Sequence, residues 1–112
     1  MEERISRKPH DVSSQFHYSR GQIFEYGIEG FGYFQAVKYD QEIEKSVCTL
    51  SDFYTFYPEC RHLATKSRMY RNIILDSHLI IYRITDERIE VLDIIHSASS
   101  IRKIRGVRSI RL

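Results

Sequence analysis

Three short apolar runs near the C-terminus constrain the fold of this 112-residue chain more than any other feature. They span residues 69–75, 79–85 and 88–96, and the turn pairs Asp76-Ser77 and Asp86-Glu87 separate them. Connections this short make consecutive strands antiparallel neighbours. In the middle run both alternating faces are partly apolar, so we expect helices on one face and another cover on the other.

A first helix is expected before the strands. Ser13 or Ser14 is a suitable N-cap, and the helix is predicted to end near residue 29. Gly30 and Gly32 then break it, because glycine is common where a helix stops. One face of this helix carries the apolar candidates Phe16, Ile23 and Tyr26 or Gly27.

A second helix is predicted over residues 33–57, with Pro58 ending it. Its apolar residues recur at spacings of three, four and seven, which is the period of a helix with one buried face. The tight glycine connection makes the two helices antiparallel neighbours. The predicted stripe consists of Ala36, Ile43, Val47, Leu50, Tyr54 and Tyr57.

These elements predict one α+β domain over residues 1–112: a helical hairpin packed on a twisted antiparallel sheet of three to four strands. Residues 1–12 are polar and contain Pro9, which an edge strand tolerates, so a short edge strand is expected there. Residues 58–69 are expected to form a polar loop.

Charge is unevenly distributed along the chain. The net charge is +2, yet residues 98–112 contain five basic side chains and no acid, which leaves −3 for the remainder. Apolar residues recur there at every third position, so this tail is either a ragged amphipathic helix interrupted at Gly106 or a segment that orders only on a partner. Such a tail suits an acidic protein or nucleic acid.

Several classes of protein are disfavoured by the composition. The five histidines and two cysteines show no metal-ligand spacing, so neither a metal nor a cofactor is expected. Cys48 is interpreted as a small core residue and Cys60 as an exposed loop residue. The N-terminus lacks the apolar stretch of a signal peptide, and no run is long enough for a membrane span, so we expect a cytoplasmic protein.

Two blocks of sequence resemble the RelE/ParE superfamily of small bacterial toxins from type II toxin–antitoxin modules. The first block matches the end of the family's first helix, its glycine break and the start of its second helix. The second matches an arginine-bearing strand, a "hLIIYRI" strand and a strand that closes on "IIH". The order and spacing of the motifs carry the resemblance. The matching segments are residues 23–32, 35–36, 38–39, 70–73, 78–84 and 88–96.

The superfamily contains two mechanisms: ParE-like members poison DNA gyrase, and RelE-like members cut mRNA on the ribosome. A terminal "IIH" is typical of the ParE branch, and no tyrosine follows Tyr82, whereas RelE-like toxins place a tyrosine or histidine near the C-terminus. The resemblance therefore implies a non-enzymatic gyrase inhibitor that serves plasmid stabilisation. It also implies a cognate ParD-like antitoxin, through which the pair would contact operator DNA. We expect the antitoxin on the second face of the middle strand.

Two alternatives remain open at this stage. A ribosome-dependent, metal-independent mRNA endonuclease would need Arg71, Arg83 and His96 to converge on one phosphate, because RNA cleavage needs an acid, a base and cations. An inactive or purely DNA-regulatory partner would do no harm when expressed alone. For the gyrase inhibitor, the candidate target- and partner-binding residues are Arg71, Arg83, His96, Arg102, Lys103 and Arg105.

Overall fold

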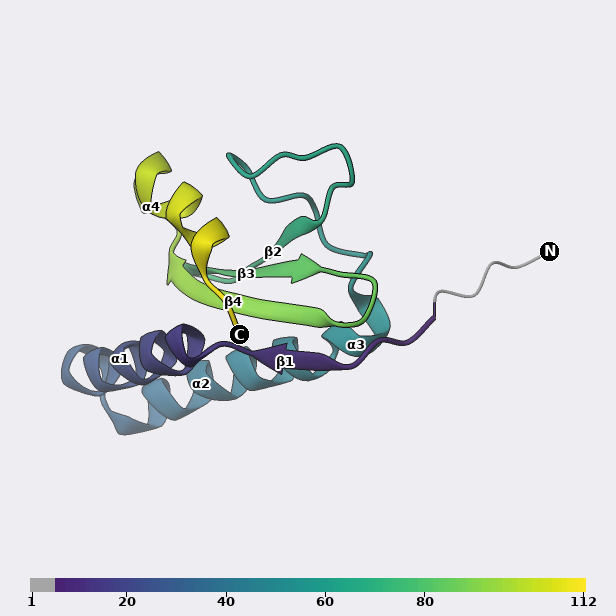
Figure 1. Cartoon of the computed structure of the whole chain (residues 1–112). Helices are drawn as coiled ribbons and strands as arrows, with labels where there is room; N and C mark the ends of the chain where they lie inside the picture. The colour runs from purple at the N-terminus through teal and green to yellow at the C-terminus, as the bar shows by residue number, and fades with distance from the viewer. Residues whose placement is uncertain (1–5) are drawn as a thin grey trace.

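A four-stranded sheet forms the middle layer of the protein, whose computed structural model describes residues 6–112 (Figure 1). The strands are β1 (His10–Val12), β2 (Tyr70–Ile74), β3 (His78–Ile84) and β4 (Ile89–His96). Their order across the sheet is β1-β4-β3-β2. β2–β3 and β3–β4 are antiparallel pairs, whereas β1 runs parallel to β4.

The three C-terminal strands confirm the sequence prediction, but the prediction of an antiparallel sheet is wrong for the fourth strand, and the sheet is mixed. Short turns force β2, β3 and β4 to alternate in direction: Leu75 N–H donates to the His78 carbonyl (2.9 Å) and Thr85 N–H to the Arg88 carbonyl (3.0 Å). A long path through the helices joins β1 to the other strands, so no turn sets its direction. β1 is the predicted edge strand; the part of that prediction covering residues 1–5 lies outside the described residues.

Helix α1 (Ser14–Phe31) begins where the sequence predicts, because Ser13 is its N-cap. The Ser13 hydroxyl accepts a hydrogen bond from the Phe16 N–H (2.9 Å) and donates one to the Leu92 carbonyl of β4. The same side chain therefore starts the helix and ties it to the sheet. Gly32 ends α1 with a positive φ of 89°, a backbone conformation that side-chain-bearing residues rarely adopt.

Helix α2 (Tyr33–Cys48) is shorter than predicted, and the prediction that Pro58 ends it is wrong. The Ser46 hydroxyl donates to the Glu42 carbonyl and the Thr49 hydroxyl to the Ser46 carbonyl (both 2.9 Å). Such side-chain bonds compete with the helical ladder. The helix stops at Cys48, and a separate short helix, α3 (Leu50–Phe53), follows it.

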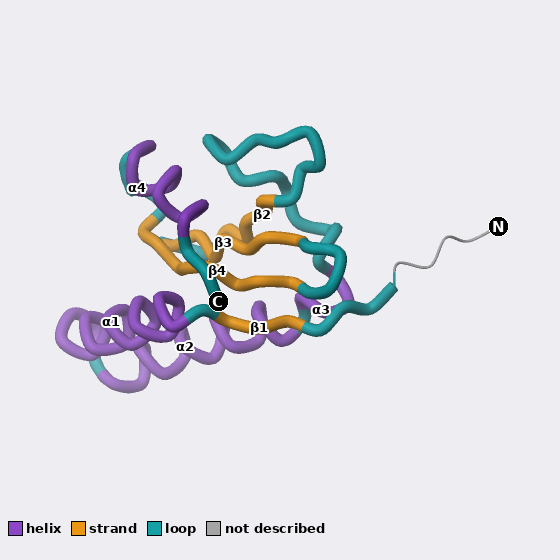
Figure 2. The backbone as a smooth tube through the Cα atoms, viewed as in Figure 1, coloured by secondary structure: helices purple, strands orange, loops and turns teal. Residues whose placement is uncertain are grey.

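The helices α1 and α2 cover one face of the sheet (Figure 2). Four residues of the predicted stripe are buried there, and Tyr57 is partly buried against them. The sixth, Ala36, is buried at the contact with α1. Of the two alternatives on α1, Gly27 lies on the side that faces α2, whereas Tyr26 points outward and is 75% exposed. A Cβ built on Gly27 would lie 3.3 Å from the Ala36 Cβ, so the two helices approach closely at that point.

The other face of the sheet is covered by the loop after α3 and by the C-terminal tail. The tail forms helix α4 (Ile101–Gly106) and continues as a 3-10 turn (Val107–Ser109), so Gly106 does not end it. Ile104 and Val107 are buried there against Ile81 and Leu92. This face of β3 is therefore occupied by the chain itself, and the expectation of an antitoxin directly on it is wrong.

The two cysteines are placed opposite to the sequence interpretation. Cys48 is exposed, because it lies beside the buried stripe at the last residue of α2. Cys60 is only 1% exposed, because the loop bends back over the sheet and the Cys60 N–H donates to the Tyr70 carbonyl (2.8 Å).

Candidate functional site

Arg83 of β3 anchors the C-terminal tail. Its guanidinium donates to the carbonyls of Arg108 (3.3 Å) and Ile110 (3.2 Å), and its Nε donates to Glu90 Oε1 (2.7 Å). Arg88 donates to the other oxygen of Glu90 (2.9 Å). Burial by itself would raise the pKa of the Glu90 carboxyl, but the hydrogen bonds from the two arginines outweigh burial and lower that pKa. Glu90 therefore stays ionised and holds Arg83 in place.

Arg71 of β2 lies on the opposite, helix-side face of the sheet from Arg83, and there it holds the start of the loop that follows α3. It pairs in register with Tyr82, whose side chain belongs to the helix-side core, so Arg71 and Arg83 lie on opposite faces. Its guanidinium donates to the carbonyls of Arg68 (3.1 Å), Thr55 (3.0 Å) and Tyr57 (3.0 Å). The two arginines do not converge, as the endonuclease alternative requires.

His96, at the end of β4, belongs to a cluster with His78 and Tyr39. The two imidazole rings meet edge to face at 5.5 Å between centroids. His96 Nδ1 accepts a hydrogen bond from the Ala98 N–H (3.0 Å), and His78 Nδ1 lies 2.8 Å from the Tyr39 hydroxyl. Burial, followed by the neighbouring His96, lowers the pKa of His78. This cluster joins α2 to the β2–β3 turn.

The basic residues predicted on the tail point to solvent. Arg102, Lys103 and Arg105 are all exposed on α4, and none forms a salt bridge with any described residue. These three cations lie far along the chain from Arg71 and on the tail that Arg83 anchors. Of the six candidates, they and the exposed His96 are the ones the fold leaves accessible.

Sequence reasoning missed a groove between the helical hairpin and the end of the sheet. Its volume is about 610 Å³. One feature of the sequence could have indicated this groove: six of the sixteen residues from position 24 to position 39 are aromatic. Its walls and floor include Phe24, Tyr26, Phe31, Tyr39, Asp76, His78 and His96.

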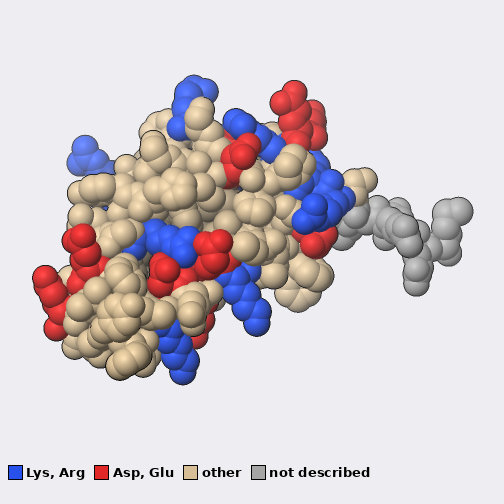
Figure 3. All heavy atoms as spheres, turned by 90° about the horizontal axis from the view of Figure 1, so that it is seen from below, with Lys and Arg blue, Asp and Glu red and all other residues tan. Residues whose placement is uncertain are grey.

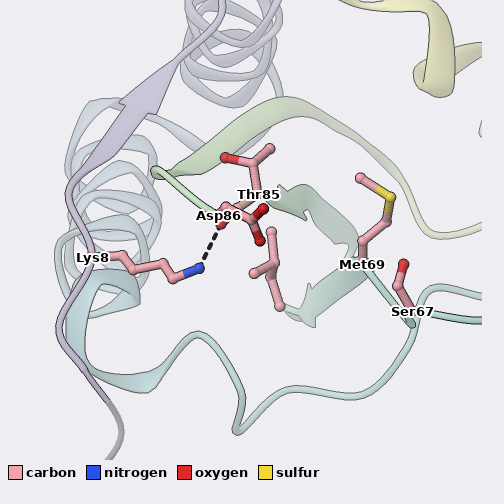
Figure 4. Close-up of a pocket in the computed structure, with 6 residues that line it drawn as sticks. Lys8, Ser67, Met69, Thr85 and Asp86 are labelled. Carbon is pink, nitrogen blue, oxygen red and sulfur yellow. Dashed lines mark hydrogen bonds between the residues drawn. The ribbon is translucent and has the colours of Figure 1, made fainter.

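A second cavity of about 440 Å³ lies between the N-terminal segment, the β3–β4 turn and the loop before β2 (Figure 4). Lys8 points toward this turn and its amino group donates to the Thr85 carbonyl. The amino group of Lys8 is therefore already hydrogen-bonded. The other lining residues, Asp86, Ser67 and Met69, form no acid–base pair and no activated nucleophile beside it. We assign this cavity no chemistry.

Within residues 6–112 no group of three or more His, Cys, Asp or Glu side chains is arranged to hold a metal ion. Among the helices that the structure describes, none is both long and apolar enough to cross a membrane.

Comparison with known proteins agrees with this architecture of a helical hairpin on a small sheet. A sequence model of the family described as "ParE toxin of type II toxin-antitoxin system, parDE" matches residues 13–101. The chain therefore belongs to the ParE toxin family.

Among solved structures, the chain is similar to one titled "Chromosomal ParDE TA system from P. aeruginosa", with a TM-score of 0.67 and 15% identity. The match covers 82% of this chain and 98% of that one, and at this identity it shows the fold. No curated protein matches the sequence significantly.

Proposed function

We propose that this ParE-family toxin inhibits DNA gyrase without itself being an enzyme, and that a cognate ParD-like antitoxin neutralises it. The membership of residues 13–101 in the ParE family supports the toxin assignment. The single observation that favours gyrase over mRNA as the target is the separation of Arg71 from Arg83 on opposite faces of the sheet. A phosphate-binding acid–base site needs those cations side by side.

The proposal divides the candidate residues into two groups. Arg71 and Arg83 position the loop and the tail through backbone carbonyls. Arg102, Lys103 and Arg105 on α4 contact the target, because they are exposed cations that form no salt bridge with a described residue. The exposed His96, nearby in sequence, contacts the target with them. In this proposal the toxin acts in the cytoplasm, needs no cofactor, contacts operator DNA only through its antitoxin and contributes to plasmid stabilisation.

The test is a supercoiling and cleavage assay with purified gyrase. We expect the wild-type protein to inhibit supercoiling and to cause gyrase-linked DNA breaks, and the cognate antitoxin to prevent both. The double variant Arg102→Glu/Arg105→Glu should inhibit at least about tenfold less, which is the size of losing contacts worth 1.4 kcal/mol. Lys66→Glu, an exposed cation in the loop before β2, is the matched control and should inhibit like the wild type.

Inducible expression in a bacterial host separates the alternatives. DNA damage without mRNA cleavage supports the proposal. Cleavage of ribosome-bound mRNA by the purified protein would replace it with the endonuclease function, and harmless expression without antitoxin would replace it with a regulatory one.

A further inference from the structure

The C-terminal tail carries a dense group of exposed cations. Residues 98–112 contain five basic side chains and no acid. All five are exposed, and none forms a salt bridge with a described residue. Helix α4 and the 3-10 turn hold four of these charges within a rise of about 15 Å. The five cations are Arg102, Lys103, Arg105, Arg108 and Arg111.

The loop after α3 extends this surface. Loop and tail cover the same face of the sheet, because Cys60 of the loop and Val107 of the tail belong to one buried cluster (Figure 1). Tyr70 joins the two segments: its carbonyl accepts a hydrogen bond from the Cys60 N–H (2.8 Å), and the Arg108 guanidinium lies 5.7 Å from its ring centroid. Arg61, which follows Cys60, adds a sixth exposed cation next to the tail. We call Arg61 and the five tail cations the basic face.

The opposite side of the molecule has the reverse balance of charge. Residues 14–53, which include α1, α2 and α3, contain three basic and six acidic side chains. Figure 3 views the protein from the side of α1 and α2, and acidic side chains lie there among the basic ones. Arg20 is paired there with Asp40 (2.8 Å) and Glu44 (2.5 Å). A polyanion is therefore drawn to the basic face and repelled by the helix side, and this polarity orients the protein on it.

The residue types on the basic face favour the phosphate backbone of a duplex. Proteins that bind single strands stack the bases on exposed aromatic rings, and protein interfaces rely on aromatic anchors. Neither the loop, residues 58–69, nor the tail, residues 97–112, contains Phe, Tyr or Trp. Tyr70, which lies between them, is only 6% exposed. Phosphate contacts need only cations, and these are what the face offers.

We infer that the basic face binds the phosphate backbone of double-stranded DNA without reading its sequence. This inference rests on the proposed function and deepens it, because the DNA contacted is the segment that gyrase holds. Five of the six cations are arginines, whose planar guanidinium binds two phosphate oxygens at once. Recognition of operator DNA still needs the antitoxin, because phosphate contacts carry no sequence information.

The experiment titrates purified toxin against a fluorescently labelled DNA duplex of arbitrary sequence, without gyrase or antitoxin, and follows anisotropy at several salt concentrations. We expect a dissociation constant of about 10⁻⁶ to 10⁻⁴ M at physiological salt, the range of non-specific binding, and the same value on a duplex of unrelated sequence. Each neutralised phosphate contributes about −0.9 to the slope of log K against log salt concentration. The wild type should therefore show a slope of about −3 to −5.

Removing charges from the tail should reduce this slope. The double variant Arg102→Gln/Arg105→Gln should make the slope shallower by about 2 and weaken binding about tenfold or more at low salt. The matched control, Lys38→Gln/Lys45→Gln, removes the same charge from two exposed lysines of α2 on the helix side. Its slope should stay within about 0.5 of the wild-type value. Both variants change exposed side chains and should melt at the wild-type temperature.

A single substitution tests whether the contact extends to the loop. Arg61→Gln should make the slope shallower by about 1. Lys66→Gln is the control in the same loop, because the neighbouring Ser67 lines the cavity at the β3–β4 turn and lies outside the cluster under the tail. If only the tail variant changes the slope, the loop does not belong to the DNA contact.

The outcomes distinguish this inference from the proposed function. Inhibition of gyrase by a toxin that does not bind duplex DNA, or whose binding both double variants weaken equally, contradicts the DNA contact and leaves gyrase as the target. Duplex binding by a toxin that leaves supercoiling untouched contradicts the proposed function and leaves the basic face as a DNA-binding surface. Tighter binding to the single strand of the same sequence, or to an RNA duplex, would overturn the assignment to double-stranded DNA.

Discussion

Both faces of the sheet are buried, but different kinds of segment cover them. The face toward α1 and α2 is covered by two long helices whose apolar stripe packs on Ile80, Tyr82 and Ile94. The face toward α4 is covered by a loop, a six-residue helix and a 3-10 turn. Arg83 holds this second cover through carbonyl oxygens of the tail.

This difference teaches where regular structure is enough and where specific polar contacts are needed. A long helix satisfies its own backbone groups, so apolar packing holds it on the sheet. A six-residue helix is too short to be stable alone, and the tail depends on Ile104, Val107 and the Arg83–Glu90 pair to stay in place. We expect the second cover to open before the first.

The largest effect should come from emptying the helix-side core. Ile43 of α2 is 1% exposed, and Ile43→Ala should lower the free energy of unfolding by about 2–5 kcal/mol, because the cavity adds to the lost burial. Ile104→Ala on α4 should cost about 2 kcal/mol at most, since a short segment can settle into the space. Urea denaturation measures both values. A larger loss for Ile104→Ala would reverse the proposed order of the two faces.

The next effect concerns the polar anchor of the tail. Arg83→Gln should cost about 2–3 kcal/mol, somewhat less than breaking an isolated buried pair, because Arg88 remains beside Glu90. The amides of α4 should then exchange faster with solvent while those of α1 keep their rates. Arg7→Gln is the control, since it removes a salt bridge whose side chains are 71% and 53% exposed and should cost less than about 1 kcal/mol. Unchanged exchange in α4 would contradict the anchoring role of Arg83.

Much of the fold was predictable because its information is local. Turn pairs and alternating apolar residues located the three C-terminal strands to within one residue at every end, and Ser13 marked the start of α1. The second helix was overextended because Leu50 and Tyr54 continue the apolar spacing beyond Thr49. The spacing of apolar residues indicates which residues are buried. It does not indicate the side-chain hydrogen bonds that compete with the backbone hydrogen bonds of the helix.

The candidate site was less predictable because its contacts are distant along the chain. The partners of Arg71 and Arg83 are mostly backbone carbonyls, which every residue type offers, so no pattern of letters reveals them. The groove depends on Gly27 and Ala36 bringing two helices together next to the β2–β3 turn. Composition indicated the aromatic residues, but their outward placement follows from this three-dimensional contact.

A smaller effect should appear when pH is lowered, and it belongs to the helix side. The pKa of His78 is lowered in the folded protein, so the folded state resists a proton that the unfolded chain takes up below about pH 6.5. The stability contributed by neutral His78 is therefore complete above that pH and is lost as pH falls below it. We expect the melting temperature of wild type to decrease between pH 7.5 and 5.5. His78→Gln should flatten part of this decrease, and an identical slope in both proteins would contradict the role of His78.

The smallest effect is kinetic and compares the exposed thiol of Cys48 with the thiol of Cys60, which lies under the second cover. Burial, with Glu59 nearby, raises the pKa of Cys60 to about 11, and the thiol lies under the second cover; Cys48 is exposed at the end of α2. A disulfide reagent at pH 8 should label the exposed Cys48 quickly. It should label Cys60 only when the second cover opens, because the reacting species must be an accessible thiolate. Cys48→Ser should remove the fast phase and Cys60→Ser the slow one. Arg83→Gln should accelerate the slow phase alone. If Cys60 instead reacts at the rate of global unfolding in both backgrounds, the second cover does not open independently, and the two faces form one cooperative unit.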